Sequence, residues 1–173
     1  MDAKKLDVIH ELANRRNRLG KTVMMKYIFL LQQVYKVPLG YDFEIYTYGP
    51  YSSEVTADVD FAKYQELISI ELNADSMGYS ITPKNCSDKS FSISIKDKLD
   101  ELMRLFGNKT ARDLELSTTI VYLYSNYKKN SWDNDCDTLS NDVYEIKPHF
   151  SLEDIKSEYA NLEENGILEL SIA

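Results

Sequence analysis

The stretch from Tyr41 to Ser53, YDFEIYTYGPYSS, constrains the fold more than any other part of the chain. Its residues up to Tyr48 alternate in character, and a period of two built from aromatic and β-branched residues predicts a strand with one buried face. The face predicted to be buried consists of Tyr41, Phe43, Ile45 and Thr47, and the opposite face consists of Asp42, Glu44, Tyr46 and Tyr48. Gly49 and Pro50 then predict the end of the strand, because Gly tolerates unusual backbone angles and Pro removes a donor.

A helix is expected after this Gly-Pro corner. Ser52 or Ser53 can cap its first turn, and Glu54 is well placed against the positive end of the helix dipole. Its apolar stripe consists of Val55, Val59 and Ala62, widened by Phe61, Tyr64, Leu67 and Ile68. An amphipathic helix of this kind is expected to pack one face on the core.

Two helices are predicted before the strand, over residues 3–18 and 22–35, and a hairpin after the third helix, with strands at 67–72 and 79–82. Three helices and a strand followed by a hairpin is the order of a winged helix-turn-helix. Residues 91–95 alternate briefly and predict a third strand for the wing.

The rest of the chain is predicted to be helical, with Thr110 and Ser151 as helix caps, each followed by an Asp at the third position. The predicted fold class is therefore α+β and mainly helical. It consists of a winged helix-turn-helix-like core at about residues 1–95 and a C-terminal helical extension at residues 96–173. We expect both to belong to a single domain, residues 1–173, since a chain of this length can bury one core.

The charge is distributed unevenly along the chain. The net charge is −8, but Met1 to Lys26 carries seven basic and three acidic side chains, while the remainder carries 13 basic and 25 acidic ones. Because sequence-independent affinity for DNA comes largely from Lys and Arg, any contact with nucleic acid is expected to be confined to a local basic patch.

The basic cluster near the end of the first helix is the candidate for such a patch, and consists of Arg15, Arg16, Arg18 and Lys21. It could also touch an acidic partner, but a solvated helix end favoured by the dipole explains it better. The triplet Gly20-Lys21-Thr22 matches the end of a Walker A loop, but the first glycine of that motif would fall at Arg15 and a helix precedes it instead of a strand. Helix-end and helix-cap residues explain the triplet better.

The sequence predicts neither a metal nor another cofactor. Cys86 and Cys136 lie far apart, with only His10 and His149 beside them in type, so a zinc site is not expected. The run from Asp133 to Asp137 begins like a calcium loop, but Thr138 stands where Gly is required and Tyr144 where Glu is required.

A cytoplasmic protein with free thiols is the expected setting. No apolar run is long enough to span a bilayer, and the N-terminus is amphipathic instead of resembling a signal peptide. Asp133 and Asp135 could serve a hydrolase or nuclease, but a solvated loop explains them better and no catalytic set converges on them. An enzyme is therefore not predicted.

The corner and the helix before it resemble a known family. The matching positions are Lys26, Phe29, Leu30, Gln32 or Gln33, Tyr48, Gly49, Pro50, Tyr51 and Ser52. They look like the Panacea antitoxin domain and the related YwgA-like bacterial and phage proteins, and the runs 114–118 (LELST) and 147–151 (KPHFS) are similar to the YwgA-like group. The resemblance implies a winged-helix-related core, a link to toxin–antitoxin pairs, phages and mobile elements, and no catalytic residues.

The first functional hypothesis is a non-enzymatic module that binds another protein, such as a toxin or a defence or phage protein, with self-association left open. Its support is the acidic balance and the thirteen tyrosines, because Tyr is enriched at protein interfaces. The candidate contact residues are Tyr46, Tyr48, Tyr51, Asp58 and Trp132.

The alternative hypothesis is a DNA-binding regulator of the winged helix-turn-helix type. Its recognition helix would run from Ser53 to Glu66, with Lys63 as its only basic residue against the four acidic residues Glu54, Asp58, Asp60 and Glu66. Readers of the major groove usually present Arg, Lys, Asn or Gln. The charge of this helix therefore opposes DNA binding, and only the N-terminal basic cluster could compensate.

Overall fold

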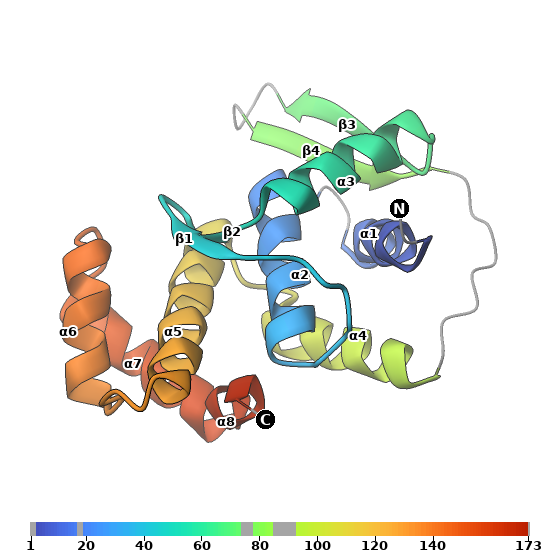
Figure 1. The fold of residues 1–173 in the computed structure, drawn as a ribbon. Coiled ribbons are helices and arrows are strands. Elements are labelled where there is room, and N and C mark those ends of the chain that lie inside the picture. Colours follow the sequence, from blue (N-terminus) through green and yellow to red (C-terminus); the bar gives the residue numbers. More distant parts are fainter. Residues whose placement is uncertain (1–2, 17–18, 74–77, 85–92, 173) are drawn as a thin grey trace.

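The computed structural model describes residues 3–16, 19–73, 78–84 and 93–172. Over these residues the chain is mainly helical, with two small antiparallel sheets, so the predicted α+β class is confirmed (Figure 1). In chain order the elements are α1 (Ala3–Arg15), α2 (Lys21–Gln33), β1 (Glu44–Tyr46), β2 (Gly49–Tyr51), α3 (Ser53–Tyr64), β3 (Ile68–Asn73), β4 (Gly78–Pro83), α4 (Ile93–Phe106), α5 (Ala111–Lys129), α6 (Cys136–Ile146), α7 (Leu152–Glu164) and α8 (Ile167–Ile172).

Helix α2 is the central element. Every residue from Val23 to Leu31 is buried, as expected for a helix that is apolar on most sides. It packs against α1, α3 and α4, against β2 and β4, and against α5, so it contacts elements of both halves of the chain. Figure 1 shows α2 between the N-terminal elements and the C-terminal helices.

The N-terminal elements surround one end of α2. Helix α1 packs against α3 and β4, and α3 packs against β3. Strands β3 and β4 form the predicted antiparallel hairpin, from the pair Ile68–Pro83 to the pair Asn73–Gly78. A single bridge joins Leu19 to Ile81 of β4. The hairpin therefore contributes the buried side chains of Ile68 and Ile81 to the core.

The predicted third strand of the wing is wrong for its described residues. Residues 93–95 form the first turn of α4, while Phe91 and Ser92 lie outside the described residues. A short alternating run is ambiguous between strand and helix. Here Ile95, Leu99 and Leu102 lie at helical spacing and pack on the core, so the helical period prevails.

The segment around the Gly-Pro corner differs from the prediction in two respects. Tyr41 is buried and Phe43 and Ile45 are partly buried, as the alternation predicts, but Thr47 is exposed. Gly49 and Pro50 do not end the β-structure, since they begin β2, which pairs with β1 so that Ile45 faces Pro50. Thr47 and Tyr48 form the turn between the strands. Proline is tolerated in so short an edge strand because no ladder needs its N–H.

The C-terminal half is organised around α5, which packs against α6, α7 and α8. Both predicted caps are present: Thr110 and Asp113 form a reciprocal capping box, and the Ser151 hydroxyl accepts from the Asp154 N–H. Gly166, with φ of +70°, follows α7. The last helix, α8, buries Ile167 and Leu168 and thus continues the core.

Two glycines allow the packing of the β1–β2 hairpin on α5 to be tested. Both have positive φ, +68° at Gly40 and +84° at Gly49, but no described atom lies near an added Cβ at Gly40. We expect Gly40→Ala to lower the free energy of unfolding by about 1–2 kcal/mol, from backbone strain alone. At Gly49 a Cβ would lie 3.0 Å from Thr119 Oγ1 and 3.3 Å from the Glu115 carbonyl oxygen. Gly49→Ala should therefore lower the free energy of unfolding by roughly 1–3 kcal/mol more than Gly40→Ala does. Urea denaturation measures both, and equal losses would contradict close packing of the hairpin on α5.

Candidate functional site

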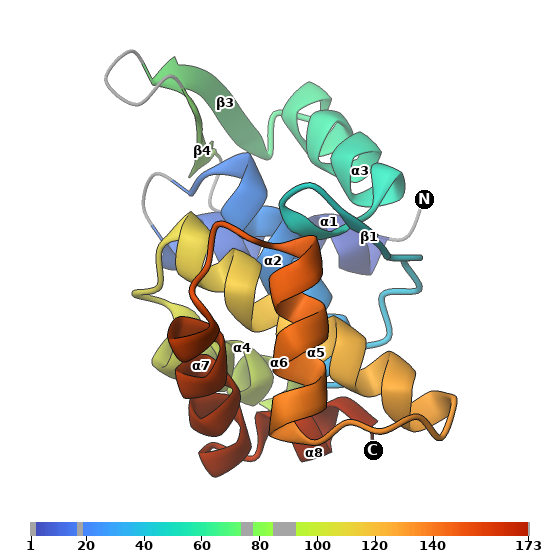
Figure 2. The same cartoon turned by 90° about the vertical axis from the view of Figure 1, so that its left-hand side faces the viewer.

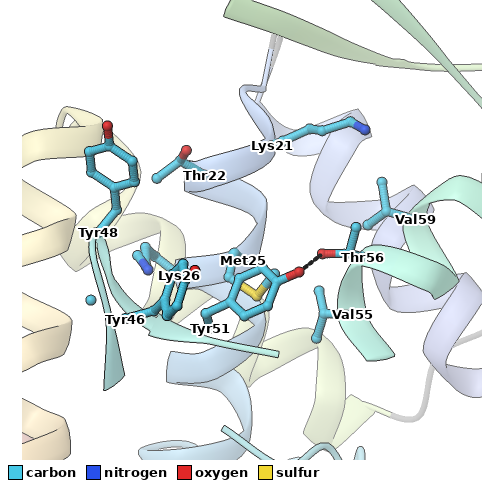
Figure 3. A pocket seen from close by; sticks show the side chains of 11 residues that line it. Lys21, Thr22, Met25, Lys26, Tyr46, Tyr48, Tyr51, Val55, Thr56 and Val59 are labelled. Carbon is cyan, nitrogen blue, oxygen red and sulfur yellow. Dashed lines mark hydrogen bonds between the residues drawn. The ribbon is translucent and has the colours of Figure 1, made fainter. Parts of the chain in front are cut away.

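A pocket of about 310 Å³ opens between α2, the β1–β2 hairpin and α3 (Figure 3). Its walls are mostly apolar and aromatic, with a few polar groups, which is the usual character of a binding pocket. Helix α2 contributes Lys21, Thr22, Met25 and Lys26, the hairpin contributes Tyr46, Tyr48, Gly49 and Tyr51, and α3 contributes Val55, Thr56 and Val59.

The three tyrosines come from the hairpin. Tyr46 and Tyr48 have 65% and 64% of their surface exposed, while Tyr51 is partly buried. The rings of Tyr46 and Tyr51 lie 5.7 Å apart, and the Tyr51 hydroxyl lies 3.3 Å from Thr56 Oγ1 on α3. Two large aromatic side chains are thus held in solvent at the edge of an apolar hollow, on a hairpin whose third tyrosine links it to α3.

Lys26 lies beneath this hairpin and is almost completely buried, with 2% of its surface exposed. Its Nζ donates to the Pro50 carbonyl oxygen at 2.7 Å. Burial lowers the pKa of Lys26 to about 8, against the opposing effect of Glu115 and with a smaller contribution from Lys147. The lysine therefore fixes β2 to α2.

A second buried lysine holds the turn of the same hairpin. Lys147, at the end of α6, donates to the carbonyl oxygens of Tyr46, at 3.0 Å, and of Thr47. Its Nζ also lies 3.1 Å from Glu115 Oε1, which in turn lies 3.2 Å from His149 Nε2. Glu115 is buried as well, and a buried charge is costly without a partner. Lys147 is that partner.

These contacts bring together three segments that are far apart in sequence. Residues 48–52 carry the Gly-Pro corner, residues 114–118 carry Glu115, and residues 147–151 carry Lys147 and His149. The residues from the second and third segments contact the hairpin that contains the first, so the three segments meet in the folded chain.

A second, more open hollow is lined by Tyr46 and Tyr48 as well, together with Arg112, Lys147 and His149. Its cations already have partners. Arg112 donates to the His149 carbonyl oxygen at 2.6 Å and its guanidinium lies 4.6 Å from the Phe150 ring centre. His149 faces Glu115. The geometry here is that of a structural network joining α5 to the segment after α6.

The predicted partner-binding residues separate into three places. Tyr46, Tyr48 and Tyr51 converge on the pocket. Asp58 has only 7% of its surface exposed and accepts a hydrogen bond from the Tyr41 hydroxyl at 2.8 Å, so it stabilises the fold. Trp132 is 59% exposed, packs edge-on against Tyr127 and follows the C-terminal end of α5 in the chain. Figures 1 and 2 show that this end of α5 lies away from β1.

The described side chains of the basic cluster are paired with acidic side chains or with hydroxyl and carbonyl oxygens of this chain. Arg15 pairs with Glu11 and Asp100, and Arg16 donates to the Tyr27 hydroxyl and to the Lys109 carbonyl oxygen. The ammonium group of Lys21 lies 3.2 Å from Asp60 and 4.9 Å from the Tyr79 ring centre. Arg18 lies outside the described residues.

The acidic run before α6 serves as a helix cap. The Asp135 carboxylate accepts from the Thr138 hydroxyl and from the N–H groups of Thr138 and Asp137, and these bonds lower its pKa to about 2. Among the described residues no group of three or more His, Cys, Asp or Glu side chains could hold a metal ion. The thiol of Cys136 is free, and Cys86 lies outside the described residues.

No helix within the described ranges combines the length and the apolar character needed to cross a bilayer.

Comparison of the chain with models of known protein families, with curated proteins and with solved structures gives no match.

Sequence reasoning did not assign a role to Lys26, Glu115 or Lys147, which hold the site together. A signal for Lys26 was present, because it is the one charged residue within the apolar run from Val23 to Leu31. A lysine surrounded by core residues must pair with something in the interior. Glu115 and Lys147 carried no such signal, since their meeting depends on the tertiary fold.

The lowered pKa of Lys26 predicts a pH dependence of stability. The pKa is about 8 in the folded chain against 10.5 for an ordinary lysine, so the unfolded chain binds more protons between these values. The free energy of unfolding should therefore rise with pH through this window. Lys26→Met removes the titration. Between about pH 7.5 and about pH 9.5, wild type should gain roughly 2 kcal/mol relative to the variant, as measured by urea denaturation. Parallel curves for the two proteins would contradict the prediction.

Proposed function

We propose that this chain is a non-enzymatic module that binds another protein, and that the partner inserts a side chain into the pocket between α2, the β1–β2 hairpin and α3. The observation that carries the proposal is the pair of exposed tyrosines, Tyr46 and Tyr48, at the edge of an apolar pocket. Tyrosine is enriched at protein interfaces because its ring buries a large area while its hydroxyl remains hydrogen-bonded.

The anchoring of the hairpin supports this use. Lys26 and Lys147 bind the carbonyl oxygens of Pro50, Tyr46 and Thr47, so the backbone that carries the tyrosines is fixed before a partner arrives. Binding then loses less conformational freedom than it would on a flexible loop.

The partner class follows from the resemblance to the Panacea and YwgA-like families. We propose an antitoxin-like module, or one related to phage and mobile-element defence, whose partner is a toxin or a defence or phage protein. Among the residues that carry the resemblance, Gly49 and Pro50 belong to the hairpin that holds the tyrosines, and Lys26 fixes this hairpin to α2. Self-association would be an outcome of the same experiments.

DNA binding has weaker support. The turn of a helix-turn-helix has 3–4 residues, whereas α2 and α3 are separated by residues 34–52, which include a hairpin. The exposed charges of α3 are Glu54, Asp60 and Lys63. A winged arrangement of α1, α2, α3 and the β3–β4 hairpin is therefore proposed only as a scaffold, with no proposal that α3 enters a groove.

The proposal predicts that one tyrosine matters and an equally exposed one does not. Tyr48→Ala should reduce the capture of the partner from native cytoplasm at least tenfold, because aromatic anchors dominate interface energies. Tyr64→Ala is the matched control, since Tyr64 is 79% exposed, lies on α3 and does not line the pocket. Both variants should fold like wild type. Quantitative mass spectrometry of the captured proteins measures the difference.

A gel shift at low salt tests the alternative. A protein captured by wild type and Tyr64→Ala but not by Tyr48→Ala would support the proposal. A salt-sensitive shift on DNA, together with capture that is the same for all three proteins, would overturn it.

A further inference from the structure

The interior of the pocket offers no free charge to an incoming group. Lys26 lines it, but its Nζ is turned to the Pro50 carbonyl oxygen. Lys21 stands at the other end of the lining and is paired with Asp60 at 3.2 Å. Figure 3 shows Met25, Val55 and Val59 around the remaining space. The group that fits this space is therefore apolar.

The volume limits the size of that group. Pockets for small molecules measure roughly 300–1,000 Å³, so a pocket of about 310 Å³ is at the lower end of the range. It suits one large apolar side chain or two small ones.

The surface around the pocket is acidic. Residues 41–64, which supply the tyrosines and the α3 wall, carry five acidic side chains and one basic one. Asp58 is buried and Asp60 is paired with Lys21, but Asp42, Glu44 and Glu54 are exposed. Glu44 is paired in register with Tyr51 and lies on the same outward face of β1 as Tyr46, so its charge is beside the pocket.

We infer that the partner docks through a basic segment, with an apolar side chain in the pocket and Lys or Arg residues on either side of it facing the acidic side chains. This inference rests on the proposed function and specifies the chemistry of the segment that is bound. Complementary charge raises the rate of association and selects against acidic partners.

The probe for the test is a random twelve-residue peptide library displayed on phage and panned on the immobilised full chain. We expect enriched peptides to contain Leu, Ile, Met, Phe or Trp flanked by Lys or Arg. A synthetic copy of the most enriched peptide is then measured by fluorescence polarisation. Thr56→Trp fills the pocket from α3 and should weaken binding at least tenfold.

Two variants with the same change in charge separate the electrostatic part. Glu44→Lys should weaken the peptide about threefold to tenfold at low salt, and the loss should shrink as the salt concentration rises. Glu71→Lys is the control, because Glu71 is also exposed and in a strand, but that strand is β3, which contributes no residue to the pocket, whereas Glu44 lies in the hairpin that does. It should leave binding unchanged.

The outcomes distinguish the two proposals. One outcome is that the enriched peptides are neutral or acidic, and that Thr56→Trp weakens their binding while Glu44→Lys leaves it unchanged. This outcome would overturn the inference but not the proposed protein binding. The other outcome is that no enriched peptide binds more weakly to Thr56→Trp than to wild type. This outcome would contradict docking at the pocket, and the proposed function with it.

Discussion

The attachment of the β1–β2 hairpin to three helices is the constraint on which the rest of the structure depends. The hairpin pairs only three residues in each strand, and a sheet of this size is not stable alone. It is held in place because two buried ammonium groups, one on α2 and one at the end of α6, donate to its carbonyl oxygens. Burying a lysine is costly unless its charge is paired and hydrogen-bonded. Here Glu115 on α5 supplies the opposite charge, so each of the three helices contributes one member of the network.

The pocket is a consequence of this attachment. A Cβ at position 49 would lie 3.0 Å from Thr119 Oγ1 and 3.3 Å from the Glu115 carbonyl oxygen, closer than an ordinary contact. Glycine at that position allows β2 to pack on both α2 and α5. Tyr51 then reaches Thr56, while Tyr46 and Tyr48 remain in solvent. The same backbone geometry thus determines both the stability of the hairpin and the shape of the candidate site.

Local signals in the sequence predicted local structure well. The capping box at Thr110, the cap at Ser151 and the alternation from Tyr41 to Tyr46 all depend on residues close together in the chain. The prediction was wrong at Gly49 and Pro50, because these residues pair with β1 and are stabilised by Lys26, which is distant in sequence. Three of the proposed contact residues converge on the pocket, but Asp58 is buried and not available to a partner, because it accepts a hydrogen bond from the Tyr41 hydroxyl, 17 positions away in the chain.

The last helix has a consequence for how the chain acquires its structure. The Ser171 carbonyl oxygen accepts hydrogen bonds from Gln33, 138 positions earlier, and from Lys36. Contacts of such large sequence separation form late and slow folding. The side chains of Gln33 and Lys36, at and just after the C-terminal end of α2, can therefore make these bonds only after Ser171 has been synthesised, so this end of the central helix is among the last parts of the structure to be completed.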